Sequence, residues 1–157
     1  MIHKISADHL TIERIGEIVY NGYKIELSDD AINRITRCRE YLDEKIRTSS
    51  QPVYGVTTGF GSLCNVSIGK DQLTQLQINL MKSHACGTGE RVPDDIVKIM
   101  MLLKIQSLSY GYSGCKVDTV EQLIRFFNNG VYPVVYRQGS LGASGDLVPL
   151  AHLCLSL

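Results

Sequence analysis

The chain has 157 residues, 44% of them hydrophobic, and its 16 basic and 16 acidic side chains leave no formal net charge. A chain of this length can form a single domain with its own core, and without a basic block or a membrane-length apolar run we expect no nucleic-acid partner and no membrane association. The five cysteines are widely spaced and form no Cys-x-x-Cys pair, so we expect reduced thiols in a cytoplasmic protein without a signal peptide, rather than disulfides or a zinc site.

The first part of the chain predicts two helices with a short strand between them. Residues 11–21 carry apolar side chains at helical spacing and end before Gly22, a common helix terminator. Residues 23–27 alternate briefly, as a short strand does. Ser28 is a good helix cap ahead of two acidic residues, and the apolar stripe that follows predicts a second helix to about residue 46.

The middle of the chain predicts an extended segment and two more helices. Residues 53–61 should be extended and enter a loop rich in glycine and threonine. In residues 71–85, apolar side chains at helical spacing share one face with His84. A helix from Pro93 to about Tyr110 has apolar residues on nearly every side and should be buried.

Asp118 and Glu121 are spaced as in a capping box, so they predict a fifth helix, which Gly130 ends. Residues 131–136 should be extended. These elements predict a mainly α fold, with a few short strands and a glycine-rich loop, in one domain over residues 1–157. The chain stops inside an apolar helical run without a terminator, so we expect a fragment truncated within a helix.

Residues 139–146 are the most distinctive stretch and read Gly-Ser-Leu-Gly-Ala-Ser-Gly-Asp. Asp146 is a good N-cap residue, and Pro149 suits the first turn of a helix. We therefore expect a glycine loop that leads into a helix N-terminus, where free N–H groups favour developing negative charge.

The triplet Ala143, Ser144 and Gly145 can in principle undergo backbone cyclisation. The Gly145 nitrogen would attack the Ala143 carbonyl, and water would be lost from the ring and from the Ser144 side chain. The product is a methylidene-imidazolone, an electrophile made from the chain itself. Gly145 presents no Cβ to hinder the attack, Ser144 supplies the leaving hydroxyl, and Ala143 is small. A plain Gly/Ser turn before a helix is the alternative.

Three further side chains have a structural and a functional interpretation. Tyr54 could be a half-buried strand tyrosine or a catalytic one, and His84 could be a hydrogen-bonded histidine at a helix end or a group that faces a substrate. We interpret His152, on an otherwise apolar helix, as a buried and hydrogen-bonded histidine. No second ligand accompanies it at metal spacing, so we predict no metal.

Residues 139–150 resemble the signature of the aromatic amino acid ammonia-lyases, the histidine and phenylalanine ammonia-lyase family. Two other stretches match in the family's order. Residues 54–61 read Tyr-Gly-Val-Thr-Thr-Gly-Phe-Gly, and residues 79–89 read Asn-Leu-Met-Lys-Ser-His-Ala-Cys-Gly-Thr-Gly. The resemblance runs from about residue 10 to the last residue and implies the N-terminal helical domain of the ammonia-lyase fold.

The resemblance implies a role for each of these residues. Tyr54 would be the acid/base that removes the β-proton of the substrate, and His84 would orient the substrate ring. The glycines near Tyr54, such as Gly61, would let the backbone approach the substrate. Gly142 and Asp146 would serve ring formation and electrostatics. The cofactor would be 4-methylidene-imidazole-5-one, formed autocatalytically from the Ala-Ser-Gly triplet, with no external cofactor.

The implied reaction is the non-oxidative removal of ammonia from a small aromatic amino acid. The Ser-His-Ala-Cys-Gly run around His84 is similar to that of the histidine ammonia-lyases, so we expect L-histidine as substrate and urocanate as product. A tyrosine ammonia-lyase or tyrosine aminomutase with the same electrophile is an alternative, and so is an inactive helical module. Family members are longer and build each active site from several subunits of a homotetramer, so we expect the isolated fragment to be inactive.

Overall fold

The computed structural model describes residues 1–49, 51–64, 66, 68–143 and 145–157, without the side chains of residues 63 and 70. The described elements are mostly helices, which confirms the mainly α fold. Contacts within the chain define two compact units, and the single domain expected over residues 1–157 stays a prediction beside this division. The first unit contains residues 1–42, 91–134 and 157, and the second contains residues 43–90 and 135–156.

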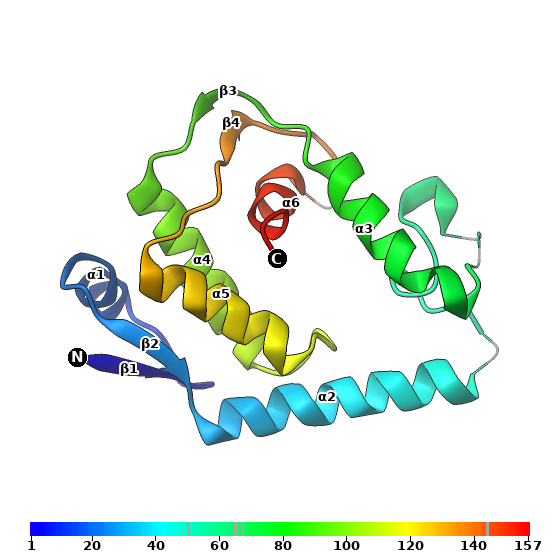
Figure 1. Cartoon of the computed structure of the whole chain (residues 1–157), viewed down its shortest axis with the longest axis horizontal. Helices are drawn as coiled ribbons and strands as arrows, with labels where there is room; N and C mark the ends of the chain where they lie inside the picture. Colours follow the sequence, from blue (N-terminus) through cyan, green and yellow to red (C-terminus); the bar gives the residue numbers. More distant parts are fainter. Residues whose placement is uncertain (50, 65, 67, 144) are drawn as a thin grey trace. The chain divides into compact units, whose positions relative to one another are not determined.

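The first unit combines a small parallel sheet with helices (Figure 1). Its strands are β1 (Ile2–Ile5) and β2 (Lys24–Leu27), joined by α1 (Ile12–Tyr20). Next along the chain is α2 (Asp29–Thr48), most of which belongs to this unit, and α4 (Asp94–Ser109) and α5 (Val117–Asn129) complete it. The strand at residues 23–27 and the helices at residues 11–21 and 28–46 are confirmed to within two residues at each end.

The sheet depends on α5 for one of its edges. Ile2 pairs with Lys24 and Ile5 with Leu27, so the strands run parallel in register. On the far side of β2, the Asn128 side chain donates from Nδ2 to the Ile25 carbonyl oxygen at 2.8 Å and accepts from the Ile25 amide nitrogen at 2.8 Å. Asn128 thus makes, with one side chain, the pair of hydrogen bonds that a neighbouring strand would make.

The core of the first unit is formed mostly by aliphatic side chains, from both strands and from all four helices. Its members are less than 9% exposed, and α4 and α5, which pack on each other, supply most of them. Burial of this apolar area is the main term that favours folding of the unit. The largest side chains that are fully buried here are those of Ile5, Ile18, Ile25, Ile35, Met101, Leu102, Ile105 and Leu123.

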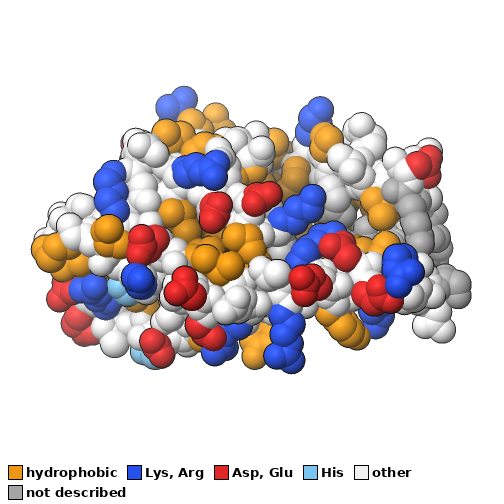
Figure 2. All heavy atoms as spheres, turned by 60° about the horizontal axis from the view of Figure 1, so that its bottom comes forward, with side chains coloured by type: hydrophobic (Ala, Val, Ile, Leu, Met, Phe, Trp, Pro, Cys, Tyr) orange, Lys and Arg blue, Asp and Glu red, His pale blue; other side chains and the backbone are white. Residues whose placement is uncertain are grey.

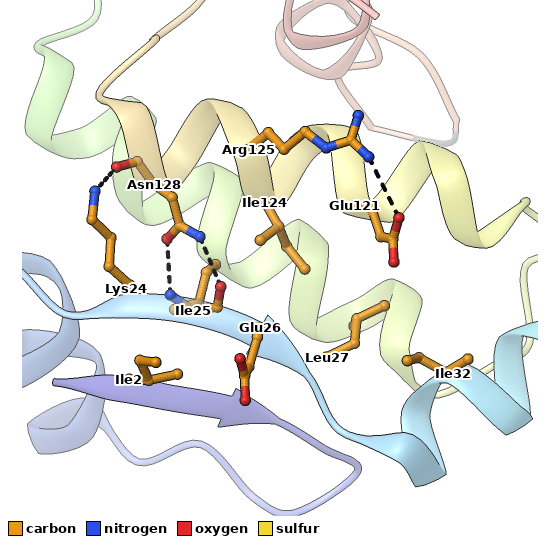
Figure 3. A pocket seen from close by; sticks show the side chains of 10 residues that line it. All are labelled: Ile2, Lys24, Ile25, Glu26, Leu27, Ile32, Glu121, Ile124, Arg125 and Asn128. Atoms are coloured by element: carbon orange, nitrogen blue, oxygen red, sulfur yellow. Dashed lines mark hydrogen bonds and ion pairs between the residues drawn. The ribbon is translucent and has the colours of Figure 1, made fainter.

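A hollow of about 450 Å³ opens between β2 and α5 in the first unit (Figure 3). Apolar side chains such as Leu27 and Ile124 line it, and a Glu121–Arg125 ion pair at 3.6 Å lies at its rim. None of the residues for which the sequence predicts a functional role lines this hollow. The candidate site residues all belong to the second unit.

The second unit begins in the last turns of α2 and is built from shorter elements. Its core is smaller and contains Leu80, Val135, Val148, Ala151 and Leu153. α3 and α6 pack on each other, and β3 pairs with β4 (Figure 1). In chain order the elements after α2 are η1 (Gly61–Leu63), η2 (Lys70–Gln72), α3 (Leu73–His84), β3 (Thr88–Arg91), β4 (Tyr136–Gln138) and α6 (Val148–Cys154).

Two expectations about local structure outside the glycine-rich loop are wrong. The fifth helix begins at Val117 with Lys116 as its N-cap, and no side chain caps it, so Asp118 lies in the first turn and forms no capping box with Glu121. Residues 53–57 form a turn in place of extended chain, because the amide nitrogens of Val56 and Thr57 both donate to the Val53 carbonyl oxygen. The turn replaces a strand that the apolar pattern had favoured.

Charges of both signs are mixed over the face drawn in Figure 2, where lysine and arginine alternate with aspartate and glutamate. Many of the ion pairs join neighbours on the same helix, such as Arg34 with Asp30 at 2.8 Å and Arg47 with Glu44 at 2.8 Å. No helix in the described part of the chain has the length and apolar character to cross a bilayer.

Candidate active site

The Asp146 carboxylate holds the glycine-rich loop at both of its ends. Its Oδ1 accepts from the Ser140 amide at 2.9 Å, from the Ser140 hydroxyl at 3.2 Å and from the Val148 amide at 3.1 Å. We call this set of bonds the Asp146 clasp. The Ser140 amide is the main cause that holds the pKa of Asp146 below its ordinary value, with the Val148 amide and the Ser140 hydroxyl adding to it and desolvation opposing them.

The clasp corrects the expected role of Asp146 as the N-cap. The N-cap position belongs to Leu147, which makes no side-chain cap bond, and α6 begins at Val148. The carboxylate still satisfies a helix N–H, that of Val148, which has no acceptor within the helix. It combines this with a bond back across the loop to Ser140.

The chain turns tightly at the predicted cyclisation triplet. The Gly145 amide donates to the Gly142 carbonyl oxygen at 3.1 Å, and Gly145 has a left-handed φ of +84° that glycine adopts without strain. Ala143 and Gly145 are exposed, and Ser144 lies outside the described residues. The bond from Gly145 to Gly142 fits ring closure onto Ala143, because it brings the Gly145 nitrogen close to the residue that precedes Ala143.

Tyr54 and Gly61, both predicted as site residues, are in contact. The Gly61 amide donates to the Tyr54 phenol oxygen at 3.4 Å, and Gly61 has a left-handed φ of +56°. Tyr54 is 62% exposed and lies in the turn that begins at Val53. Its hydroxyl is therefore bonded only weakly and is open to a ligand.

Phe60 joins Tyr54 to His84, and the sequence interpretation missed it. Its ring lies edge-on to Tyr54, with 5.7 Å between centroids, and edge-on to His84, with 5.9 Å between centroids. Gly55 makes room for the ring, because a Cβ there would come within 2.7 Å of Phe60 Cε1. The signal in the sequence was the Gly-Phe-Gly run, which ends the 54–61 stretch that resembles the family.

His84 is the last residue of α3, where it shares a face with Leu73, Leu76 and Leu80 as expected. Its Nδ1 lies 2.8 Å from the Leu80 carbonyl oxygen, which can only accept, so Nδ1 carries the proton. The Ser83 hydroxyl lies 3.0 Å from the same nitrogen. In this tautomer Nε2 is left as a hydrogen-bond acceptor at the outer end of the ring.

The contacts thus gather the predicted residues into two groups within the second unit. Tyr54, Gly61 and His84 form one group around Phe60. Gly142, Gly145 and Asp146 belong to the loop, closed by the turn and the clasp. Among the described residues, no three histidine, cysteine or acidic side chains gather as metal ligands, and the absence of a metal stays a prediction.

The model of the aromatic amino acid lyase family matches residues 10–157. The chain belongs to this family. The histidine ammonia-lyase of Streptococcus gordonii is 46% identical over the whole of this chain, and that of Clostridium tetani is 44% identical over 98% of it. The chain spans about 31% of the length of the first of these relatives and 30% of the second.

Solved structures of the family have the same fold over this length. The histidine ammonia-lyase of Trypanosoma cruzi is 36% identical, with a TM-score of 0.85 over 99% of this chain and 29% of its own. The phenylalanine aminomutase of Pantoea agglomerans is 31% identical, with a TM-score of 0.89 over 99% of this chain and 29% of its own. The likeness therefore extends to lyases and aminomutases alike.

Proposed function

We propose that this chain is the part of a histidine ammonia-lyase that carries the electrophile and the catalytic tyrosine. The observation that carries the proposal is the tight Gly142–Gly145 turn held by the Asp146 clasp, in a chain 46% identical to named histidine ammonia-lyases. The reaction would remove ammonia from L-histidine and give urocanate.

The cofactor would form from residues 143–145 without an external group. Once formed, a methylidene-imidazolone supplies an electrophilic carbon that captures the substrate and makes its amine a better leaving group. The clasp orders the loop around the triplet at both ends, and the left-handed Gly145 leaves its nitrogen unhindered by a side chain. Gly142 accepts the hydrogen bond that closes the turn.

The phenol of Tyr54 would take the β-proton of the substrate as ammonia leaves. Its oxygen already accepts a bond from the Gly61 amide, which orients the phenol before the substrate binds. His84 would orient the imidazole of L-histidine through Nε2, which is an acceptor in the tautomer that Leu80 selects. The edge-on packing of both rings against Phe60 restricts their separation before the substrate arrives.

A tyrosine-specific lyase or an aminomutase is the second candidate. The tyrosine aminomutase of Streptomyces globisporus is 27% identical, with a TM-score of 0.86, and His84 could also accept a hydrogen bond from a phenol. An aminomutase would use the same electrophile and return ammonia to the β-carbon. We further propose that the active protein is a homotetramer in the cytoplasm, as the family resemblance implies.

The test uses two proteins. The first is the 157-residue chain, whose intact mass reports ring formation as the loss of two waters from the peptide with Ala143 to Gly145. The second, which we call the swap protein, is the S. gordonii enzyme with its matching 31% replaced by this chain. Urocanate formation from L-histidine by the swap protein supports the proposal.

The competing outcomes are distinct. Preference of the swap protein for L-tyrosine would favour the second candidate, and a β-amino acid product would identify an aminomutase. The lyase proposal would be contradicted by a folded, tetrameric swap protein whose intact mass shows the ring and which turns over no aromatic amino acid. The isolated chain should be inactive, and turnover by it would contradict the need for other subunits.

A further inference from the structure

His152 makes a hydrogen bond to a backbone amide 65 residues away. His152 lies on α6 and is 9% exposed as a residue, and its Nε2 accepts from the Gly87 amide nitrogen at 2.9 Å. The N–H group can only donate, so Nε2 is unprotonated and the proton lies on Nδ1. The ring also packs edge-on against Tyr136, with 5.4 Å between centroids. This confirms a buried, hydrogen-bonded histidine, and it gives the imidazole a specific partner.

Gly87 fits tightly against α6 and β4. A Cβ on Gly87 would come to 2.9 Å from His152 Nε2, to 3.0 Å from Val148 Cγ1 and to 3.2 Å from Tyr136 Cβ. The backbone therefore approaches both elements as closely as it can, and only glycine permits this. The hydrogen bond to His152 lies at the centre of the contact.

The contact between Gly87 and α6 links the two groups of residues in the candidate site. Gly87 follows His84 by three residues, just beyond the end of α3. Val148, which Gly87 touches, donates its amide to Asp146 and so belongs to the Asp146 clasp. Displacement of Gly87 from α6 would therefore shift the end of α3 that carries His84, together with the helix start on which the clasp depends.

We propose that His152 is a positioning residue for the lyase site, acting through its bond to the Gly87 amide. It holds the end of α3 against α6, so that the position of His84 relative to the glycine loop stays fixed. The Gly87 amide needs an acceptor that reaches it from α6. Because the position is buried, that acceptor should carry no charge. A neutral imidazole satisfies both conditions. The inference rests on the proposed function, because His84 and the glycine loop are parts of an active site only if the chain belongs to a lyase.

Two substitutions separate the hydrogen bond from the packing. His152→Phe keeps a ring against Tyr136 but removes the acceptor, and His152→Gln keeps an acceptor of similar reach but removes the ring. We would measure amide hydrogen exchange of Gly87 and Val148 by NMR in the 157-residue chain. We expect His152→Phe to speed exchange at both amides by about tenfold, as loss of one hydrogen bond predicts, and His152→Gln to restore slow exchange.

A role in packing alone would give the reverse order, with His152→Gln the more damaging change, and would overturn the proposal. Unchanged exchange in His152→Phe would overturn it as well. The unaltered chain supplies a test that needs no variant. The ¹⁵N shifts of the His152 ring should show an unprotonated Nε2, and a proton on Nε2 would overturn the proposal.

None of these measurements requires turnover, so they separate this inference from the proposed function. In the swap protein we expect His152→Phe to lower kcat/KM and His152→Gln to recover it. An unaltered swap protein without lyase activity would remove the proposed function and leave the exchange results standing. Active swap protein with equal rates in both variants would remove the positioning role alone.

Discussion

The Asp146 carboxylate occupies the space in which Gly139 would carry a Cβ. A Cβ built there would lie 2.1 Å from Oδ2, 2.3 Å from Oδ1 and 2.5 Å from Cγ of Asp146. The first glycine of the loop and the aspartate at its end are thus fitted to each other across six residues. The clasp requires both.

Substitution of Gly139 should therefore open the clasp. We expect Gly139→Ala to push the carboxylate away, so that the Val148 amide loses its acceptor and exchanges faster by about tenfold. Gly142→Ala is the matched control for this readout, since a Cβ there meets only the Gly145 carbonyl oxygen at 3.9 Å. Equal exchange rates in the two variants would show that the contact does not hold the loop.

The clasp should depend on pH in a defined direction. Hydrogen bonds hold the pKa of Asp146 below its ordinary value of 3.8, so the folded loop prefers the ionised carboxylate. The contribution of the clasp is then complete above pH 3.8 and is lost as the pH falls through the lowered pKa. An NMR titration of the Asp146 carboxyl carbon should give a midpoint below 3.8, and Gly139→Ala should raise that midpoint.

Removal of the Tyr54 hydroxyl should abolish proton transfer while leaving the fold intact. Tyr54→Phe keeps the ring against Phe60, and a side chain that is 62% exposed contributes little to stability. In the swap protein we expect kcat to fall by roughly 10² to 10⁴, the usual contribution of general acid–base catalysis. A loss of less than threefold, with unchanged melting temperature, would assign the proton transfer elsewhere.

His84 should determine which ring the site accepts. His84→Leu removes the Nε2 acceptor but keeps an apolar side chain beside Phe60. We expect kcat/KM of the swap protein for L-histidine to fall by about tenfold or more relative to L-phenylalanine, because the polar ring loses its partner. Equal losses for both substrates would instead indicate a role in holding the end of α3.

Two glycines offer a test of backbone conformation without any change of contacts. A Cβ at Gly16, inside α1, or at Gly22, just after it, would meet no atom within 4 Å. Only Gly22 has a left-handed φ, of +68°. We expect Gly16→Ala to raise the free energy of unfolding by about 0.5–1 kcal/mol and Gly22→Ala to lower it by about 1 kcal/mol, measured by urea denaturation.

Local patterns in the sequence predicted the elements whose signals are themselves local. Gly130 ends α5 in a left-handed conformation with φ of +67°, as its position past the apolar stripe indicated. Ser28 caps α2 as its position ahead of the apolar stripe indicated, because its hydroxyl accepts from the Ala31 amide at 3.2 Å. Such signals lie within a few residues, so one stretch of sequence can be enough to find them. The caps expected at Asp118 and Asp146 were nevertheless wrong.

Other features depended on contacts that a local pattern does not contain. β1 was not expected, because its partner β2 lies 22 residues further along the chain. At residues 53–57 the apolar pattern favoured a strand, but the Thr57 hydroxyl accepts from the Val53 amide at 2.8 Å and stabilises a turn. Phe60 was missed since its role comes from His84, which belongs to another element.

The pairing of Asn128 with Ile25 also bears on how this chain behaves beside other molecules. A small sheet exposes the backbone groups of its outermost strands, and such a border can recruit a strand from a second chain and start aggregation. Asn128 occupies those groups at Ile25 of β2 with its own side-chain amide. A hydrophobic residue of similar size at this position would fill the space but leave the Ile25 backbone groups free to pair with another strand.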